Sequence, residues 1–405
     1  MPAAPDLSFH IGNIAFKNPF IVGSGPTVRT LGQLKMAEQA GWAGASIKLA
    51  IDPFPYLSFP PRYRWMKKER YHIFTAEKRL TADESLRLTE QACRKAADGF
   101  VVIPTMTYDG EDIEGWAKLA RRFVAAGARI LELNMCCPNM SFNLSSTGAS
   151  TVKHTGASLG NDLVEMPKVV RSIVDAVAPV PVIAKFSADG NMAPAAARLA
   201  VQAGAAAVGH NGNFLGVPDI DIRKPLQGIY RLQDQITLGC MSGAALRPLC
   251  LRVTYQMRQA VGPAPVILSS GGVTDLATAV EHMMVGGDAV WICTQTMIHG
   301  FDWLPKMLEQ FTGYMREMGF SKLADLRDLL HRNIAAASGL TVHPGQAVFD
   351  AAKCTACGAC WKLGHCCAIT HPAGATVYDR ERCLACSTCV DVCPAGAFSM
   401  QRTDA

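Results

Sequence analysis

The sequence predicts an α/β protein in which a large (β/α)8 barrel, the TIM-barrel fold, is followed by a small α+β domain. Three observations lead to this prediction. Up to about residue 320 short apolar runs alternate with helical patterns, nine of the fifteen cysteines lie between Cys354 and Cys393, and the composition changes between these two regions. With 405 residues and 49% apolar content, the chain is long enough for two domains and a large core. We place the barrel in residues 1–340 and the small domain in residues 345–405.

Eight apolar runs are typical of strands in a buried parallel sheet, because such strands are apolar on both faces. They are FIVGS from Phe20, ASIKLA from Ala45, VVIPT from Val101, RILELN from Arg129, PVIAKF from Pro181, AAVGHN from Ala206, PVILSS from Pro265 and AVWIC from Ala289. A helical pattern follows each run, directly or after a loop. Eight βα units in about 300 residues match a (β/α)8 barrel, and an open doubly wound sheet is the alternative.

The connections between the strands give two further expectations. Helical patterns cover residues 84–100, 163–178 and 301–332, the last of which follows the final strand. Two connections, residues 50–83 and 211–244, are much longer than the others. In a barrel both would emerge beyond the carboxyl ends of the strands, where long loops are usually lids or binding walls.

Charge and hydropathy exclude two classes of partner. The net charge is +5, but the 39 basic residues are spread along the chain without a dense block, so we expect no nucleic acid partner. No run of about 18 uncharged apolar residues appears, and the N-terminus lacks the pattern of a signal peptide. We therefore expect no membrane span and a cytoplasmic location.

The cysteines near the C-terminus have the spacing of iron–sulfur ligands. Cys383, Cys386, Cys389 and Cys393, the last followed by Pro394, reproduce the bacterial ferredoxin pattern, in which three thiolates bind one cluster and the fourth binds its neighbour. Zinc is the weaker reading, because zinc sites generally pair two short cysteine hairpins. The pattern predicts a bacterial-ferredoxin-like domain with [4Fe–4S] clusters.

An earlier triplet in the same region departs from this spacing. Cys354, Cys357 and Cys360 are also spaced two residues apart, but Gly364 stands where a fourth ligand is expected. Cys366 and Cys367 follow at once, so either could supply the missing ligand after a local enlargement of the loop, or neither does and one iron has a different ligand. With crossover, one cluster takes the first triplet and Cys393, and the other takes the second triplet and one of these two cysteines.

Several polar and glycine residues lie where the barrel strands end. The turn Gly271-Gly272 ends strand seven and Cys293-Thr294 ends strand eight, so their backbone amides lie where barrels commonly bind phosphate. Lys48 and Lys185 lie near the ends of apolar strands, a position that is unfavourable unless each ammonium meets an anion or a dipole. The pattern indicates an anionic ligand at the barrel mouth, although a lysine can also reach solvent at the rim.

Strand four ends in Asn134-Met135-Cys136-Cys137-Pro138, and a loop rich in Gly, Ser and Thr follows. The amide of Asn134 can donate and accept hydrogen bonds, and a thiol at Cys137 could deliver a proton to a ligand. A lone cysteine is otherwise more often a buried apolar residue.

This motif resembles Asn-x-Ser-Cys-Pro of the dihydropyrimidine dehydrogenase and class 1 dihydroorotate dehydrogenase family. The likeness extends along essentially the whole chain and includes KNPF from Lys17, SGAALRP from Ser242, the two strand-end lysines and Asn211. A barrel followed by a two-cluster domain resembles the C-terminal part of dihydropyrimidine dehydrogenase and its small-chain bacterial counterpart.

The resemblance implies that flavin mononucleotide (FMN) binds at the barrel mouth and that Cys137 is the general acid. The substrate-binding positions would be Asn134, Asn211 and Gly212. The implied FMN contacts are Ser24, Lys48, Asn134, Lys185, Ser242, Gly243, Gly271, Gly272, Cys293 and Thr294.

The implied reaction is the reduction of a ring C=C bond conjugated to a carbonyl, or its reverse, with hydride from FMN and a proton from Cys137. Pyrimidine is in doubt as the ring, because Thr105 to Gly110 offers no asparagine after strand three and Gly212 stands where the family has threonine. Another cyclic enone or heteroaromatic is therefore open. The stretch Pro53 to Trp65, rich in Pro and aromatic residues, either reshapes the pocket or is a packed loop.

An electron donor must be a separate protein, because the chain has no Gly-x-Gly-x-x-Gly between a strand and a helix; GSGPTV at Gly23 ends strand one and is only a partial match. We expect a subunit that uses FAD and NAD(P)H, or a soluble ferredoxin, and an assembly that is a homo-oligomer or a hetero-oligomer. The other functional readings are a dihydroorotate dehydrogenase and an electron-transfer subunit without catalysis.

Overall fold

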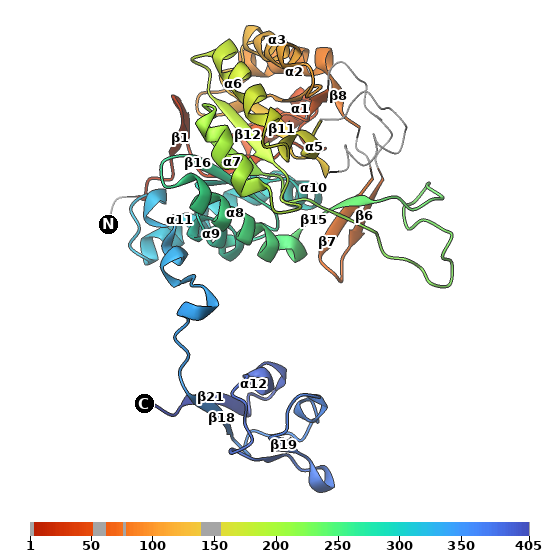
Figure 1. Cartoon of the computed structure of the whole chain (residues 1–405), viewed down its shortest axis with the longest axis vertical. Coiled ribbons are helices and arrows are strands. Elements are labelled where there is room, and N and C mark those ends of the chain that lie inside the picture. Colours follow the sequence, from red (N-terminus) through yellow and green to blue (C-terminus); the bar gives the residue numbers. More distant parts are fainter. Residues whose placement is uncertain (1–3, 52–61, 76–77, 139–154, 405) are drawn as a thin grey trace. The chain divides into compact units, whose positions relative to one another are not determined.

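The computed structural model describes residues 4–51, 62–75, 78–138 and 155–404. It divides into two compact units, Met1–Asn333 and Ile334–Ala405 (Figure 1). The first unit contains the long parallel sheet and most of the helices. The second contains short antiparallel strand pairs and nine cysteines.

The first unit is built around a parallel sheet of eight barrel strands, two of which are interrupted. In chain order the strands are β3 (Phe20–Val22), β4 (Gly44–Ser46) continued by β5 (Ala50–Ile51), β9 (Val101–Ile103) continued by β10 (Thr105–Thr107), β11 (Leu131–Met135), β12 (Val182–Phe186), β13 (Ala207–His210), β16 (Val266–Ser270) and β17 (Ala289–Ile292). A short strand, β8 (Leu80–Thr81), is added beside β5.

The sheet closes on itself at its interrupted strands. Only Pro104 separates β9 from β10. At one end of the strand order β9 pairs with β4, and toward the other end β10 pairs with β11 and β5. The predicted barrel is therefore confirmed, each of the eight predicted runs contributes a strand, and the open doubly wound sheet is wrong.

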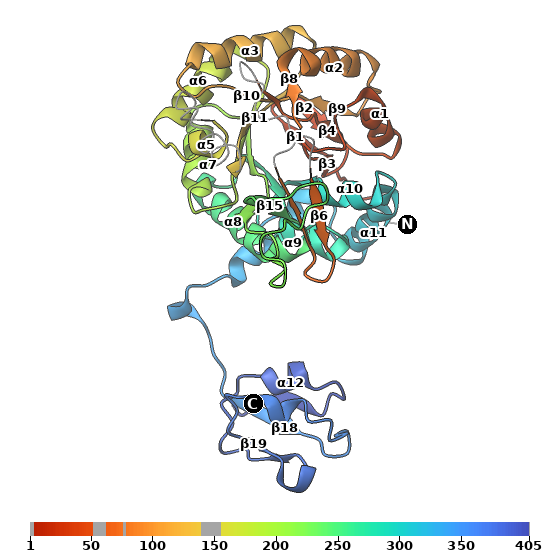
Figure 2. The same cartoon turned by 90° about the vertical axis from the view of Figure 1, so that its right-hand side faces the viewer.

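Helices surround this barrel, as Figure 2 shows. They are α1 (Leu31–Gln39), α2 (Ala82–Lys95), α3 (Ile113–Ala125), α5 (Ala157–Gly160), α6 (Glu165–Val177), α7 (Ala193–Gln202), α8 (Arg247–Val261), α9 (Leu276–Met284), α10 (Thr294–His299) and α11 (Trp303–Glu317). Among the described residues no helix has the length and apolar character needed to cross a membrane.

Two helices end earlier than the sequence pattern predicted. The pattern over residues 84–100 overshoots α2, which ends at Lys95, and the pattern over residues 301–332 overshoots α11, which ends at Glu317. Ala96, directly after α2, has an extended backbone with a ψ angle of 136°, and Gly319, two residues after α11, has a positive φ angle of 75°, so neither helix continues. The apolar residues beyond Gly319 form only short 3-10 turns.

A hairpin of β1 (Phe9–Ile11) and β2 (Ile14–Phe16) fills the amino-terminal end of the barrel. Ile11 and Phe16 are fully buried and pack with Ile183 and Leu268 from the barrel interior. Because this end is filled with apolar side chains, ligands have access at the opposite end, where the strands finish.

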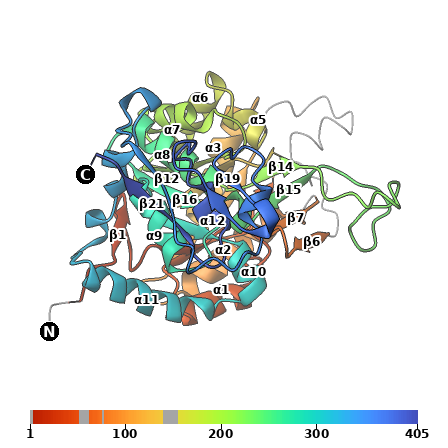
Figure 3. The ribbon, with the colours of Figure 1, turned by 90° about the horizontal axis from the view of Figure 1, so that it is seen from below.

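Parts of the two long connections form a second sheet. The first contributes β6 (Tyr63–Met66) and β7 (Tyr71–Phe74), and the second contributes β14 (Phe214–Gly216) and β15 (Gly239–Ser242). They pair in the order β14-β15-β7-β6, and Figure 3 shows them together. Most of the stretch Pro53 to Trp65 lies outside the described residues.

The second unit holds two short antiparallel ladders. β18 (Gly345–Phe349) pairs with β21 (Phe398–Arg402), and β19 (Ile369–Thr370) pairs with β20 (Val377–Tyr378). A short helix, α12 (Thr388–Val392), contains Cys389, which is in the small core of this unit.

Candidate functional site

The predicted mouth residues line two adjoining cavities at the carboxyl end of the barrel. The larger has a volume of about 750 Å³ and the smaller about 510 Å³. The predicted residues that line the larger one are Ser24, Lys48, Asn134, Cys137, Lys185, Asn211, Ser242, Cys293 and Thr294. Those that line the smaller one are Asn211, Gly212, Ser242, Gly243, Gly271, Gly272, Cys293 and Thr294. Gly212, which the sequence placed with the substrate, thus lines only the cavity that contains the glycine turn.

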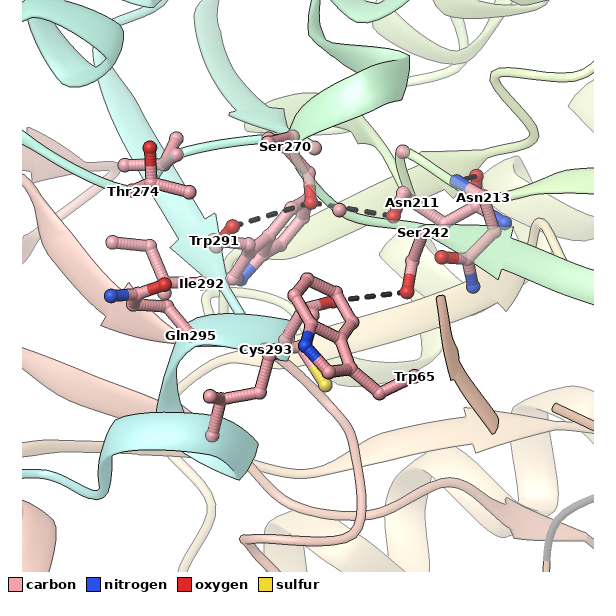
Figure 4. A pocket seen from close by; sticks show the side chains of 18 residues that line it. Trp65, Asn211, Asn213, Ser242, Ser270, Thr274, Trp291, Ile292, Cys293 and Gln295 are labelled. Carbon is pink, nitrogen blue, oxygen red and sulfur yellow. Dashed lines mark hydrogen bonds between the residues drawn. The ribbon is translucent and has the colours of Figure 1, made fainter. Parts of the chain in front are cut away.

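Glycine backbone and side-chain hydroxyls form one part of the smaller cavity, and the rest includes Trp65, Trp291 and Ile292 (Figure 4). Gly271 and Gly272 have φ angles of +101° and +80°, so a side chain at either position would be strained. The backbone of Gly212 also lies against Gly271: a Cβ on Gly212 would come within 2.6 Å of the Gly271 Cα. Ser242 Oγ and Thr294 Oγ1 form a hydrogen bond of 2.9 Å at this cavity.

This chemistry fits a bound phosphate, because phosphate oxygens accept hydrogen bonds from hydroxyls and backbone amides. No aspartate or glutamate among the described residues lines either cavity. The larger cavity is lined instead by three cationic side chains, Lys48, Arg79 and Lys185. Together the two cavities offer a site for an anionic cofactor such as FMN.

A buried ion pair supports the floor of the larger cavity. Lys185 Nζ lies 3.0 Å from Glu132 Oε1, and both residues are almost completely buried. Ser46 Oγ donates to Glu132 Oε2 at 2.6 Å, and Trp291 Nε1 donates to Ser46 Oγ at 3.1 Å. The ammonium of Lys185 also lies 4.1 Å from the centroid of the Trp291 ring. Burial opposes the charge of Lys185, but the negative charge of Glu132 outweighs it and raises the pKa of Lys185.

Cys137 lies at the end of β11 in a positive environment. A hydrogen bond from the neighbouring Cys136 thiol, together with the positive charges of Arg79 and Lys48, lowers the pKa of Cys137 well below its usual range. Burial raises the pKa of Cys136, so Cys136 stays a thiol. Its S–H donates a hydrogen bond to the Cys137 sulfur. Burial and the charge of Arg79 lower the pKa of Lys48 to about 7.

The two predicted asparagines are already engaged with the protein. Asn211 donates from Nδ2 to the carbonyl of Cys136 at 2.7 Å and accepts from the amides of Ala188 and Asn213 at 3.1 Å. Asn134 Oδ1 accepts from the amide of Cys136 at 3.4 Å. Each keeps donor capacity on its amide nitrogen, and both hold the Cys136–Cys137 segment in place.

The lining residues that the sequence reasoning missed include Arg79 and Asn213, whereas Trp65 ends the stretch that it expected either to reshape the pocket or to pack as a loop. Arg79 belongs to the first long connection, Asn213 follows Asn211 by two residues, and Trp65 comes from β6. Position after a strand could have indicated Asn213. No local signal identifies Arg79, which directly precedes β8, a strand that pairs with β5 of the barrel sheet.

The cysteines of the second unit line two separate cavities. One, of about 280 Å³, is lined by Cys354, Cys357, Cys360 and Cys393. The other, of about 380 Å³, is lined by Cys366, Cys367, Cys383, Cys386 and Cys389. Each cavity thus has at least four sulfur donors, the donor set that a [4Fe–4S] cluster requires.

A substitution at Glu132 tests the buried ion pair. We expect Glu132→Leu to lower the free energy of unfolding by about 3–5 kcal/mol, because it leaves the Lys185 ammonium buried without its counter-charge. The double variant Glu132→Leu/Lys185→Met should recover most of this loss. Urea denaturation followed by tryptophan fluorescence measures both.

The pH dependence of the free energy of unfolding gives a second test of the ion pair. In the native chain the pKa of Lys185 is raised, so its stabilisation is complete at neutral pH and is lost only as the pH rises through that pKa. In Glu132→Leu, burial outweighs the remaining charges of Cys136 and Cys137 and lowers the pKa of Lys185, so the free energy of unfolding should rise with pH. Equal losses in the single and double variants would contradict the ion pair's role.

Comparison with known proteins identifies the family. The family model described as dihydroorotate dehydrogenase matches residues 80–315, which is more than half of the chain, and the model described as 4Fe-4S binding domain matches residues 376–399. The second match covers the regular cysteine quartet and not the earlier triplet.

The relatives are named either as dihydropyrimidine dehydrogenases or as dihydroorotate dehydrogenases. NAD-dependent dihydropyrimidine dehydrogenase subunit PreA of Escherichia coli (strain K12) is 26% identical over 369 residues, which cover 88% of this chain and 84% of the relative. Chloroplastic dihydropyrimidine dehydrogenase (NADP(+)) of Arabidopsis thaliana is 24% identical, in an alignment that covers 80% of this chain and 76% of the relative. Dihydroorotate dehydrogenase A (fumarate) of Limosilactobacillus reuteri (strain DSM 20016) is 30% identical, in an alignment that covers 52% of this chain and 62% of the relative. This chain is an oxidoreductase with a 4Fe-4S binding domain, and it belongs to the dihydroorotate dehydrogenase family.

Proposed function

We propose that this protein is an FMN- and iron–sulfur-dependent oxidoreductase that reduces, or in reverse oxidises, a C=C bond of a pyrimidine-like ring. The observation that carries the proposal is the position of Cys137: it lies among cationic groups in a cavity that adjoins the Gly271-Gly272 turn. When bound, FMN would supply hydride transfer at its N5 atom.

The FMN contacts proposed from the sequence divide between the two cavities. Ser242, Gly243, Gly271, Gly272 and Thr294 would bind the phosphate through hydroxyls and amides. The residues that would face the flavin ring and its ribityl chain are Ser24, Lys48, Asn134, Lys185 and Cys293. A cation near the ring's N1 and O2 atoms favours the reduced, anionic flavin, and the bond to Glu132 keeps Lys185 charged for this role.

Cys137 would hold the proton that is added to the ring. Ring reduction needs the thiol, so its rate should fall as the pH rises through the lowered pKa of Cys137. Ring oxidation needs the thiolate, so the reverse rate should fall as the pH drops through the same pKa. The hydrogen bond from Cys136 and the charges of Arg79 and Lys48 therefore set the pH range of each direction.

The ring would be held by the spare amide hydrogens of Asn134 and Asn211, and by Asn213. Thr105 and Thr107, which lie in β10 where the family has asparagine after strand three, are completely buried and line neither cavity. The substrate is thus a pyrimidine or another cyclic enone or heteroaromatic that needs fewer partners. A dihydroorotate dehydrogenase activity is the second candidate, because the matching family model carries that description.

The second unit would hold two [4Fe–4S] clusters that pass single electrons. One cluster takes Cys354, Cys357, Cys360 and Cys393. The other takes Cys383, Cys386, Cys389 and one of the adjacent pair Cys366 and Cys367.

We assign the fourth ligand of this second cluster to Cys366. Its side chain packs in the same small core as Cys389 and Cys383. Cys367 is exposed, and its thiol donates to the carbonyl of Arg382 at 3.4 Å. Contact with these thiols, rather than burial, favours Cys366, because Cys357 and Cys386 are also exposed although they belong to the regular triplets.

Electrons would come from a separate protein. The relative in Escherichia coli is named as an NAD-dependent enzyme's subunit. We propose for this chain a partner subunit that uses FAD and NAD(P)H, or a soluble ferredoxin. If no ring compound reoxidises the reduced protein, the chain would instead be an electron-transfer subunit without catalysis.

A substrate panel tests the proposed reaction. The protein, purified without oxygen, should show flavin absorbance and, once reduced, be reoxidised by one of uracil, thymine or orotate. Cys137→Ser should retain flavin and clusters but turn over about 10² to 10⁴ times more slowly, because it lacks the acidic thiol. Cys93→Ser, at a cysteine that lines neither cavity, is the matched control. Absence of flavin from the native protein would refute the proposal.

A pair of cysteine variants tests the cluster assignment. Cys366→Ala should lose about half of the cluster iron, because one cluster loses a ligand, whereas Cys367→Ala should retain all of it. Iron analysis and electron paramagnetic resonance of the reduced protein measure the difference. The reverse pattern would assign the ligand to Cys367, and loss in neither variant would indicate a ligand other than cysteine.

A further inference from the structure

Behind the Gly271-Gly272 turn, four buried polar side chains form a continuous line of hydrogen bonds. They come from four elements: His210 from β13, Thr254 from α8, Ser269 from β16 and His282 from α9. All four are 0% exposed, and none lines either of the two mouth cavities. They lie in the layer between the barrel strands and the surrounding helices.

The contacts along this line are short. His210 Nε2 lies 2.8 Å from Thr254 Oγ1, which lies 2.5 Å from Ser269 Oγ. Ser269 Oγ lies 2.6 Å from His282 Nδ1, and His282 Nε2 lies 2.9 Å from the carbonyl oxygen of Gly271. The line therefore ends on the backbone of the glycine turn.

Only one arrangement of protons satisfies all of these contacts. A carbonyl oxygen can only accept, so His282 must carry its proton on Nε2. Burial lowers the pKa of His282 to about 4, so the ring is neutral and its Nδ1 must accept the proton of Ser269. The Ser269 oxygen then accepts from Thr254, and Thr254 accepts from Nε2 of His210.

The surroundings of His210, at the other end of the line, are consistent with this order of donors and acceptors. With its proton on Nε2, His210 has a bare Nδ1, and this atom is buried without a hydrogen-bond partner among the described residues. An unpaired buried acceptor is less unfavourable than an unpaired buried N–H donor. Thr254 Oγ1 is also placed to donate to the carbonyl oxygen of Cys250 at 3.0 Å, so its proton is shared between this oxygen and Ser269.

This line fixes the orientation of the Gly271–Gly272 peptide. The C=O of Gly271 and the N–H of Gly272 belong to one planar trans peptide and point in opposite directions. Because His282 holds the carbonyl on the helix side, the N–H of Gly272 is directed away from that side, and Gly272 lines the smaller cavity. Both residues are glycines with positive φ, so nothing in their own conformational preferences would hold this peptide in one orientation.

The orientation matters because the smaller cavity has no charged side chain to bind an anion. Among the described residues that line it there is no lysine, arginine or histidine. A phosphate there would depend on backbone N–H groups and on the hydroxyls of Ser242 and Thr294. A reversed peptide would instead present a carbonyl oxygen to the phosphate, and the two would repel each other.

We propose that His282 is a positioning residue that locks the Gly271–Gly272 peptide with its N–H toward the cavity, and that it thereby selects a flavin that bears a phosphate over one that does not. The inference rests on the proposed FMN function. His282 does not touch the ligand; it acts through the carbonyl of Gly271.

Titration of the full-length protein with two flavins tests this role. Flavin is removed by dialysis against potassium bromide without oxygen, and FMN or riboflavin, which lacks the phosphate, is added back while flavin fluorescence is recorded. His282→Leu should weaken FMN binding about tenfold or more, since a hydrogen bond to a charged group depends on the lost orientation. Riboflavin binding should change less than about twofold.

Two variants separate this role from a general loss of structure. His282→Gln can still donate to the Gly271 carbonyl from its amide nitrogen and should recover most of the FMN affinity. His331→Leu removes another histidine that contacts a backbone carbonyl, that of Val285 at 3.0 Å, at a position outside both cavities. It should leave both affinities unchanged.

Equal losses for FMN and riboflavin in His282→Leu, or no loss for FMN, would overturn the inference. If that variant does not fold, Ser269→Ala, which frees the histidine to change its proton position, should show a smaller loss that is again restricted to FMN. A native protein that binds neither flavin would refute the proposed function itself. Equal affinities of the native protein for both flavins would overturn only the role given to His282.

Discussion

The ion pair between Glu132 and Lys185 is the interaction on which the site depends. It joins neighbouring strands β11 and β12 inside the barrel, and through Ser46 it also reaches Trp291 of β17. Apolar side chains fill the barrel below it, and the two cavities lie above it. A charge at this depth is stable only with a partner, so the pair determines that a cation, rather than an apolar side chain, faces the ligand. Gly209 leaves room for the Trp291 ring, because a Cβ there would come within 2.4 Å of it.

Much of the fold and part of the site could be predicted from the sequence. Barrel strands are short, apolar on both faces and separated by helices, so their pattern is local, and all eight predicted strands form. Residues directly after a strand end at the same mouth in any such barrel, which is why Lys48, Asn134, Cys137, Lys185 and Thr294 meet. The cysteine quartet is equally local, because its spacing alone matches one cluster geometry.

What the sequence could not supply depends on contacts between distant segments. The two long connections pair as one antiparallel sheet, which positions Trp65 at the smaller cavity. Arg79 belongs to no motif and lines the larger cavity because it directly precedes β8, which pairs with β5 of the barrel sheet. Glu132 stands in the predicted strand, but its partner at Lys185 is set by the register of two strands. The hydrogen-bonded line that ends at His282 likewise requires four elements in place, and no periodicity marks its members.

The central claim is that electrons pass between the iron–sulfur clusters and a flavin beside Cys137, so that the ring substrate is linked to both. The most direct measurement is a single-turnover experiment in which the fully reduced protein, without oxygen, is mixed with the ring substrate while flavin and cluster absorbance are recorded separately. Our account predicts that flavin absorbance returns first and that cluster absorbance then returns through the flavin, in the same protein. Clusters that stay reduced while the flavin is reoxidised by excess substrate would contradict it.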